Sequence, residues 1–198
     1  MYTSPVSLVL GFHGCDRSIG ERVIRGDIGH LRKSENRYDW LGNGIYFWEN
    51  NPERALDFAR ERQQRPRGSR ASIQEPFVLG AVIELGNCLN LLESTSLQMV
   101  AEAYDRLAAL CANSGTPLPV NAKDEETGDR LQRDLDCAVL ETLQQLNESK
   151  PFDTVRGAFI EGPELYPNAG FRAKNHIQLC VRNPACIKGY FRLLPDKD

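Results

Sequence analysis

The chain has 198 residues, of which 41% are hydrophobic, 26% charged and 8% aromatic. This is the composition of an ordinary globular protein, and the length predicts one domain over residues 1–198. The sequence holds no run of 18 apolar residues, so we expect neither a membrane-spanning helix nor a membrane partner. The net charge of −3, from 24 Lys and Arg against 27 Asp and Glu, argues against a globally basic nucleic-acid-binding protein.

The six cysteines are scattered along the chain and include no Cys-x-x-Cys pair. This pattern argues against a disulfide framework and against a standard zinc site, so we expect a reduced, cytoplasmic protein. His176, Cys180 and Cys186 also match no zinc-ligand spacing. No metal is predicted.

The first elements along the chain are two short strands separated by a loop. Residues 7–12 are apolar and precede His-Gly, which predicts a buried strand that ends at a turn. Asp16 or Ser18 can cap a short helix after it. Residues 33–44 are polar and rich in glycine and predict a loop, and residues 44–48 predict the second strand.

A helix and a broken strand follow. Asn51 and Pro52 are typical of a helix start, and the helix has apolar residues at helical spacing. Residues 77–92 are rich in Val, Ile and Leu and are interrupted by Gly86-Asn87, which predicts two strands.

The second half of the chain predicts two amphipathic helices and three strands. Leu97 to Cys111 and Leu131 to Leu146 repeat apolar residues every three or four positions. Strands are expected at residues 157–161, 176–181 and 187–193. Since the helices lie between strand-rich halves, we predict an α+β domain with a helical insertion at residues 94–150.

The charged residues are unevenly distributed. Arginine is concentrated at positions 60, 62, 65, 67 and 70, and acidic residues at 124, 125, 126, 129, 134 and 136. The arginine cluster is open to two interpretations, a solvated loop or a contact for phosphate, nucleic acid or an acidic partner.

Three patches carry residue types that suggest a binding site. In the first, His13 precedes Gly14, so a ligand can approach the backbone beside an imidazole; an isolated histidine is more often structural. In the second, a glycine-containing loop leads to Tyr46, with Phe58 one helix later. Two such rings could sandwich a flat heterocycle, or both could belong to the core. In the third, Gln178 interrupts an apolar strand, either as a functional amide or as a buried amide satisfied by backbone.

In this order the three patches resemble the ADP-ribosyltransferase superfamily, in the branch of poly(ADP-ribose) polymerases and diphtheria toxin with a His…Tyr…Glu triad. His13-Gly14 resembles the histidine-glycine element, and residues 41–47 (LGNGIYF) resemble the Gly-x-Gly-Ile-Tyr-Phe element. Gln178 stands where the branch has its glutamate. The residues Ser34, Asn36 and Asp39 are similar to the lead-in of uncharacterised bacterial members that carry glutamine there.

The resemblance implies two packed, mainly antiparallel sheets with a central NAD cleft, peripheral helices and NAD as a substrate. It implies that His13 binds the adenosine-side ribose and that the Gly14 backbone binds the nicotinamide carboxamide. Tyr46 would stack on the nicotinamide, with Phe58 near its other face. Ser34, Asn36 and Gly44 complete the expected NAD-binding set. A GxGxxG fingerprint is absent, so NAD is not expected to bind as in a Rossmann fold.

The expected reaction cleaves the nicotinamide–ribose bond and develops oxocarbenium character. The Gln178 amide can anchor a ribose hydroxyl but cannot supply negative charge. Glu161 or Glu164 could supply the carboxylate, and His176, on the same strand face as Gln178, could act as a base. Transfer of a single ADP-ribose is therefore favoured over chain elongation.

The leading hypothesis is a mono-ADP-ribosyltransferase, toxin-like or regulatory, that modifies a macromolecular acceptor, protein or nucleic acid. A toxin-like protein raises the question of a neutralising partner protein. The alternatives are an NAD glycohydrolase on the same fold, a relative of RNA 2′-phosphotransferases, and a non-catalytic NAD-binding or interaction module. The phosphotransferase is disfavoured because the clustered Arg and His that it needs are not evident.

Overall fold

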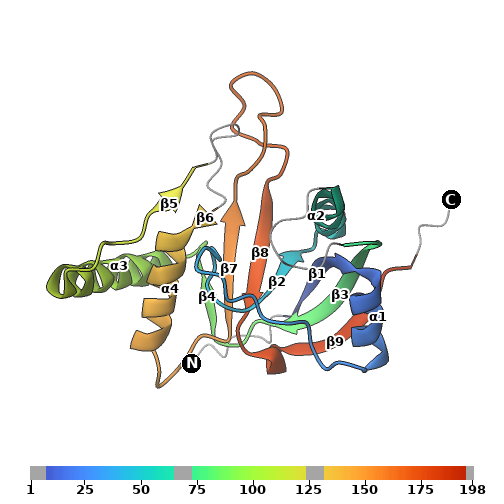
Figure 1. Cartoon of the computed structure of the whole chain (residues 1–198), viewed down its shortest axis with the longest axis horizontal. Helices are drawn as coiled ribbons and strands as arrows, with labels where there is room; N and C mark the ends of the chain where they lie inside the picture. The colour runs from blue at the N-terminus through green and yellow to red at the C-terminus, as the bar shows by residue number, and fades with distance from the viewer. Residues whose placement is uncertain (1–7, 65–72, 124–131, 195–198) are drawn as a thin grey trace.

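The computed structural model of the chain describes residues 8–64, 73–123 and 132–194. These residues form an α+β fold with a mixed seven-stranded sheet, a small two-stranded sheet and four α-helices (Figure 1). The elements in chain order are β1 Leu8–Asp16, α1 Arg17–Arg25, β2 Ile45–Glu49, α2 Pro52–Gln64, β3 Pro76–Glu84, β4 Cys88–Asn90, α3 Ser94–Ser114, β5 Asn121–Ala122, β6 Gln132–Arg133, α4 Asp134–Leu146, β7 Thr154–Phe159, β8 His176–Val181, the 3-10 turn Pro184–Cys186 and β9 Ile187–Arg192.

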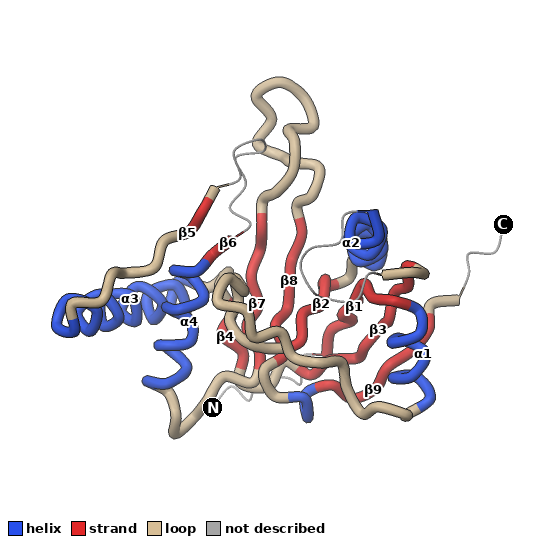
Figure 2. Tube along the Cα trace, viewed as in Figure 1, coloured by secondary structure: helices blue, strands red, loops and turns tan. Residues whose placement is uncertain are grey.

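The large sheet has the strand order β4-β7-β8-β2-β1-β3-β9, and every neighbouring pair except β4–β7 is antiparallel. The helices gather at its two ends (Figure 2): α3 and α4 lie beside β4 and β7, whereas α1 and α2 lie beside β1 and β3. The antiparallel character was expected. The expectation of two separate sheets was not met, because β1 and β2 hydrogen-bond the two halves into one sheet.

That junction is the weakest in the sheet. Nine residue pairs join β1 to β3, but only Gly11–Glu49 and Phe12–Trp48 join β1 to β2. The two strands therefore part after Phe12 and form a fork, which we call the β1–β2 fork. The prediction that the first strand ends at a turn after residue 12 was wrong, because pairing with β3 carries β1 through to Asp16.

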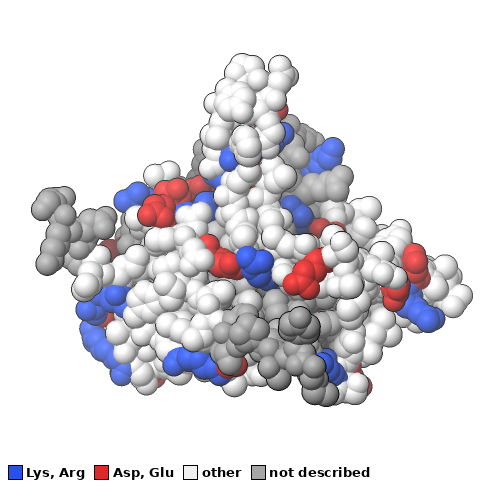
Figure 3. Space-filling model, turned by 180° about the vertical axis from the view of Figure 1, so that it is seen from behind, with Lys and Arg blue, Asp and Glu red and all other residues white. Residues whose placement is uncertain are grey.

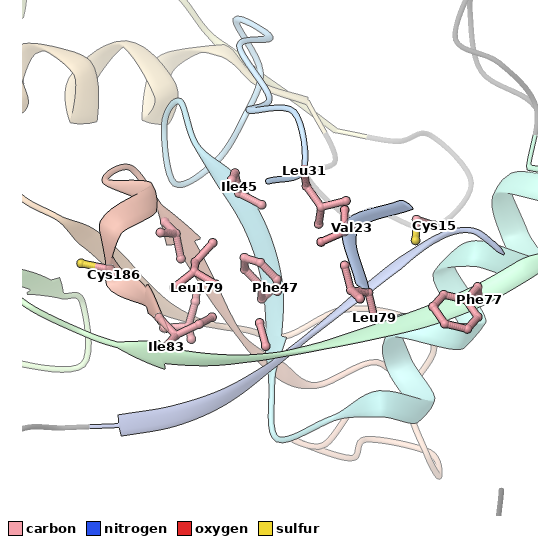
Figure 4. Packing of buried hydrophobic residues seen from close by; sticks show 13 residues of the cluster. Cys15, Val23, Leu31, Ile45, Phe47, Phe77, Leu79, Ile83, Leu179 and Cys186 are labelled. Carbon is pink, nitrogen blue, oxygen red and sulfur yellow. The ribbon is translucent and has the colours of Figure 1, made fainter. Parts of the chain in front are cut away.

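Two apolar clusters cover the two faces of the sheet. One joins β1, β2, β3 and β8 to α1 and includes Phe47, Leu79 and Leu179 (Figure 4). The other packs α3 and α4 on the opposite face and includes Leu41, Leu140 and Cys180. Since residues of a strand alternate between faces, Phe47 and Tyr46 belong to different clusters.

Most predicted elements are present, with shifted boundaries. Asp16 caps α1 by accepting a hydrogen bond from the Ser18 N–H, and Asn51 caps α2 by accepting one from the Arg54 N–H. Strand β7 begins at Thr154, three residues earlier than predicted. Helix α4 begins at Asp134; Leu131, the expected start, lies outside the described residues. The pair β5–β6 was not predicted, because two-residue strands leave no periodicity.

All six cysteines are free thiols, in agreement with the expected absence of a disulfide framework. Within the described ranges, none of the helices has the length and apolar character needed to cross a membrane.

Gly14 allows α2 to lie against β1. A Cβ atom at this position would stand 2.1 Å from the carbonyl oxygen of Ala55. We predict that Gly14→Ala lowers the free energy of unfolding by about 3 kcal/mol, because backbone must move to relieve the clash. Urea denaturation measures this loss. Gly189→Ala, in strand β9 where the added methyl meets nothing within 4 Å, is the matched control. Equal stability of the two variants would contradict this packing.

Candidate functional site

His13 stands at the point where the β1–β2 fork opens. The register of the two strands, continued by one more hydrogen-bonded pair, would place Gly14 opposite Tyr46. Instead, the Nδ1 atom of His13 lies 2.7 Å from the carbonyl oxygen of Tyr46. Because a carbonyl only accepts, Nδ1 carries the proton and Nε2 is left as an acceptor. Burial lowers the pKa of His13, so the ring is neutral near pH 7.

The bond from His13 occupies the carbonyl that Gly14 would face in a continued ladder. The Leu10 carbonyl accepts a hydrogen bond from the Asn50 N–H, so even-numbered residues of β1 turn their backbone groups toward β2. The residue pairs of the β1–β2 ladder end at Phe12, so the N–H and C=O of the buried Gly14 point toward β2 beyond the last pair.

Tyr46 is fixed by the loop that precedes it. Its hydroxyl donates to the carbonyl of Gly42 at 2.8 Å and accepts from the N–H of Leu41 at 2.9 Å. Burial raises the pKa of Tyr46 well above its usual value, so the hydroxyl keeps the proton that it donates. These bonds hold the ring on the face of the sheet that carries Gln178.

The expected NAD-binding residues Ser34, Asn36 and Gly44 build this loop. Ser34 and Gly44 exchange backbone hydrogen bonds of 2.7 and 3.0 Å. The Asn36 amide donates to the Ser34 hydroxyl at 2.8 Å and to Asp39 at 3.0 Å. A Cβ on Gly44 would lie 2.4 Å from the sulfur of Cys180, so glycine lets the loop pack on β8. The structure gives all three a structural role; their contact with NAD stays a prediction.

An ion pair that was not predicted from the sequence fixes the same loop. Glu141 of α4 binds Arg182 with two bonds of 2.6 and 2.9 Å and accepts from the Asn43 N–H at 2.8 Å. Burial, the largest effect on Glu141, raises its pKa, but the bonds from Arg182 and Asn43 outweigh it and the pKa lies below the ordinary value. No sequence signal links two residues 41 positions apart.

Gln178 is buried, with 4% of its surface exposed, and lies opposite Trp48 in the β2–β8 ladder. Its side-chain carbonyl accepts a hydrogen bond of 2.5 Å from the indole N–H of Trp40. Trp40 in turn stacks on Phe159 of β7, with ring centroids 4.6 Å apart. The amide therefore has a fixed orientation, and its partner is a side chain rather than the backbone of the alternative interpretation.

His176 lies two residues before Gln178 on the same strand face, as predicted. Its Nδ1 donates to the carbonyl of Lys174 at 2.6 Å, which leaves Nε2 as an acceptor. Burial, with smaller contributions from the nearby Arg54 and Arg133, outweighs that hydrogen bond and lowers the pKa of His176 to about 4. The imidazole is neutral near pH 7 and able to accept a proton, although its low pKa makes it a weak base.

Phe58 lies against Trp48, and its expected position near the nicotinamide ring stays a prediction. Its ring centroid lies 5.0 Å from that of Trp48, and these two belong to a cluster separate from that of Tyr46. Guanidinium groups cover this aromatic surface: Arg54 lies 5.6 Å from the Trp48 ring and Arg62 lies 5.2 Å from the Phe58 ring. Trp48 was not predicted as a site residue, because its place in an apolar run is typical of the hydrophobic core.

Several buried polar atoms on this face have no hydrogen bond, although Arg54 forms an ion pair with Glu61 at 3.8 Å. In the described part of the chain the Trp48 Nε1, the His176 Nε2 and the Arg54 Nε and Nη1 atoms are buried without a hydrogen bond. Trp48 and His176 are 4% and 7% exposed. Because buried polar groups are normally bonded, unbonded ones gathered at one place are typical of a functional site.

The remaining predicted residues lie around this face. Glu161 is buried, and its carbonyl accepts from the Lys174 N–H at 2.9 Å just beyond the β7–β8 ladder. Glu164 is exposed and pairs with Arg172 at 3.8 Å. Of the arginine cluster, Arg60 and Arg62 belong to α2, whereas positions 65, 67 and 70 lie outside the described residues, as do acidic positions 124, 125, 126 and 129.

A groove of about 590 Å³ lies next to this site, between α3, α4 and β7. It shares Trp40 and Phe159 with the site but does not include His13, Tyr46 or Gln178. In the described ranges no cluster of three His, Cys, Asp or Glu residues is placed to hold a metal ion.

Comparison of the chain with protein-family models, with curated proteins and with solved structures finds no match.

Removal of the Tyr46 hydroxyl tests whether its hydrogen bonds anchor the loop before β2. We predict that Tyr46→Phe lowers the free energy of unfolding by about 1–3 kcal/mol, because the Leu41 N–H loses its buried acceptor. Chemical denaturation measures the change. Tyr38→Phe, at an exposed tyrosine of the same loop, is the control and should leave stability within about 0.5 kcal/mol. A Tyr46→Phe protein as stable as that control would contradict the proposed anchoring.

His176 predicts a loss of stability in mild acid. Its folded-state pKa of about 4 lies below the ordinary 6.5, so the unfolded chain takes up the proton first as the pH falls. Stability is complete above pH 6.5 and falls toward pH 4, by about 3 kcal/mol for this group. Urea denaturation between pH 7 and pH 4.5 should show a smaller loss in His176→Gln than in the wild type. Equal slopes in His176→Gln and the wild type would reject the assignment.

Proposed function

We propose that the protein is an NAD-dependent mono-ADP-ribosyltransferase with the ADP-ribosyltransferase fold. The observation that carries this proposal is the β1–β2 fork, where the His13 imidazole bonds to the Tyr46 carbonyl and the strand pairing ends two residues before Gly14. The motifs that resemble the superfamily, His13-Gly14, Tyr46 and Gln178, come from three neighbouring strands, and Gln178 lies on the same face of the sheet as the Tyr46 ring.

The polar groups at the fork match the hydrogen-bonding groups of the carboxamide and of the ribose in nicotinamide riboside. The Gly14 N–H and C=O can pair with the carbonyl and amine of the carboxamide. The Nε2 atom of His13 can accept from a ribose hydroxyl, since its tautomer is fixed by the bond to Tyr46. Tyr46 and Phe58 would flank the nicotinamide ring, with Trp48 beside Phe58 as a further contact.

The reaction breaks the C1′–N bond of the nicotinamide riboside. The electron pair leaves with nicotinamide, which becomes neutral, and a lone pair of the acceptor bonds to C1′ while its proton is released. Gln178, fixed by Trp40, can hold a ribose hydroxyl but does not balance the charge of the oxocarbenium ion. Nicotinamide is a good leaving group, so orientation at the fork can supply much of the rate.

His176 and Glu161 are the candidates to receive the proton of the acceptor. His176 has an unbonded Nε2 on the face of Gln178 and is neutral near pH 7, which supports this role. Glu161 lies at the start of the loop that leads into β8. The acceptor is a macromolecule, protein or nucleic acid, and a neutralising partner protein is part of the proposal if the protein acts as a toxin.

Release of nicotinamide from labelled NAD in the presence of a cell lysate tests the proposal. We predict that His13→Ala and Tyr46→Ala lower the rate by 10²-fold or more (an order-of-magnitude figure for lost orienting groups). Gln178→Glu should preserve or raise the rate, by up to about 10²-fold, because a carboxylate keeps the bond from Trp40 and adds charge. His30→Ala and Tyr38→Ala, at exposed residues, are the matched controls, and circular dichroism verifies that each variant is folded.

The products separate the alternatives. Label on a macromolecule, lost in His13→Ala, supports transfer, whereas free ADP-ribose alone indicates an NAD glycohydrolase. NAD binding by the folded wild type without turnover would replace the proposal by a non-catalytic NAD-binding module. Loss of activity in a folded Gln178→Glu protein would mean that the amide has a role outside the triad.

A further inference from the structure

The groove between α3, α4 and β7, which we call the α3–α4 groove, is apolar apart from three charged residues. Its volume of about 590 Å³ lies in the range of ligand-binding sites. Helix α3 supplies one wall and helix α4 the other, and Trp40 and Phe159 line the groove on the side of the sheet. The apolar residues of the two walls are Leu97, Val100, Ala101, Tyr104, Leu135, Val139 and Leu140.

The α3 wall is accessible to a partner. Leu97 and Tyr104 are 52% and 40% exposed, and because they stand two helical turns apart they lie on one face of α3. Figure 3 shows that most of the surface at the α3 end of the molecule carries no charged group. A continuous apolar face that is open to solvent commonly marks an interaction site.

Strand β7 has an open edge at this groove. Its pairing with β4 ends at Asn90–Arg156, and the Arg156 carbonyl accepts a hydrogen bond of 2.8 Å from the Leu91 N–H. Backbone groups of a strand alternate in direction, so the N–H and C=O of Ala158 point to the same side as those of Arg156, beyond the last pair with β4. Such an edge is a template for another strand.

Ala158 reaches the groove through its backbone. It is exposed and lines the groove together with Phe159. The Phe159 ring packs in the cluster that α3 and α4 form, so the side chain of Ala158 points to the other face of the sheet. The open edge and the apolar walls are therefore parts of one site, which fits an extended peptide with side chains that alternate between two faces.

The charges of the groove favour a basic partner. Its three charged residues are Arg133, Asp105 and Asp136. Arg133 is engaged within the protein, since it pairs with Asp136 at 3.6 Å and lies 5.0 Å from the Trp40 ring. Asp105 forms no ion pair with any other described residue. A Lys or Arg side chain of a partner would complement it, whereas nucleic acid would be repelled.

We propose that the α3–α4 groove binds an extended segment of a partner protein. The segment adds a short strand to β7 at Ala158, places every second side chain between the helices, and sets a basic side chain beside Asp105. Trp40, which lines the groove, also holds the Gln178 amide, so the bound segment lies next to the candidate site. The inference uses none of the residues proposed to bind NAD and does not depend on the transferase function.

Selection of short random peptides displayed on phage against the folded protein supplies the probe for the test. We expect sequences with an apolar residue at every second position and at least one Lys or Arg. The affinity of a selected peptide, synthesised with a fluorescein label, is then measured by fluorescence polarisation. N-methylation of the backbone nitrogens that face β7 should weaken binding by about tenfold or more, whereas methylation of the alternate nitrogens should be tolerated.

Ala101→Arg fills the groove from an exposed position on α3 and should weaken binding of the selected peptide by about tenfold or more. Ala109→Arg is the matched control, because Ala109 is exposed on the same helix and is not part of the groove lining. Its affinity should stay within about twofold of the wild type. Circular dichroism verifies that both variants are folded. In the ¹⁵N-labelled wild type, the Ala158 amide should show a nuclear Overhauser effect to the peptide backbone.

Several results would overturn the proposal. They are a failure to select any peptide, selected sequences with an apolar repeat of three or four residues as in a helix, and equal affinities of the wild type and Ala101→Arg. A dimer of the free protein in sedimentation equilibrium that Ala101→Arg dissociates would show that a second copy of the chain fills the groove instead. Since peptide binding is measured without NAD, none of these results bears on the proposed function.

Discussion

The hydrogen bond from the His13 imidazole to the Tyr46 carbonyl is the constraint on which the candidate site depends. It takes the acceptor that the Gly14 N–H would use if the β1–β2 ladder continued, so the sheet stays joined while its edge opens. A fork without this bond would leave a half-buried carbonyl short of a partner. One side chain therefore stabilises the point at which the two strands separate.

On the opposite side of the fork, a few hydrogen bonds and one ion pair fix the loop that precedes β2. The loop before β2 is tied to Tyr46 through its hydroxyl and to Arg182 through Glu141, and it carries Trp40 to the Gln178 amide. The arrangement explains how a glutamine can occupy the third position of the proposed triad in one orientation. The indole N–H that fixes it would serve a carboxylate equally well, so the local structure does not require an amide.

Most helices and strands could be predicted, and the three motifs recognised, because each leaves a pattern within a short stretch of sequence. Helix caps at Asp16 and Asn51, alternation in β8, and the Gly-rich loop before Tyr46 can be recognised within a few residues. The fork and the Glu141–Arg182 clamp arise from pairing between segments more than 30 residues apart, and no local pattern encodes register over that distance. The contact of Phe58 with Trp48 depends on how α2 packs on β2. The continuation of β1 through His13-Gly14 was missed because a His-Gly pair, typical of a turn, was outweighed by nine residue pairs with β3.

The central claim is that NAD binds at the β1–β2 fork. A titration of the ¹⁵N-labelled protein with NAD, followed by amide chemical shifts, tests it most directly and does not depend on turnover or on the acceptor. We predict that the amides of Gly14 and of residues 44–48 shift first and most, with the Gly14 amide moving downfield as its N–H binds an acceptor on NAD. Shifts confined to the groove between α3 and α4, or no shifts at millimolar NAD, would contradict it.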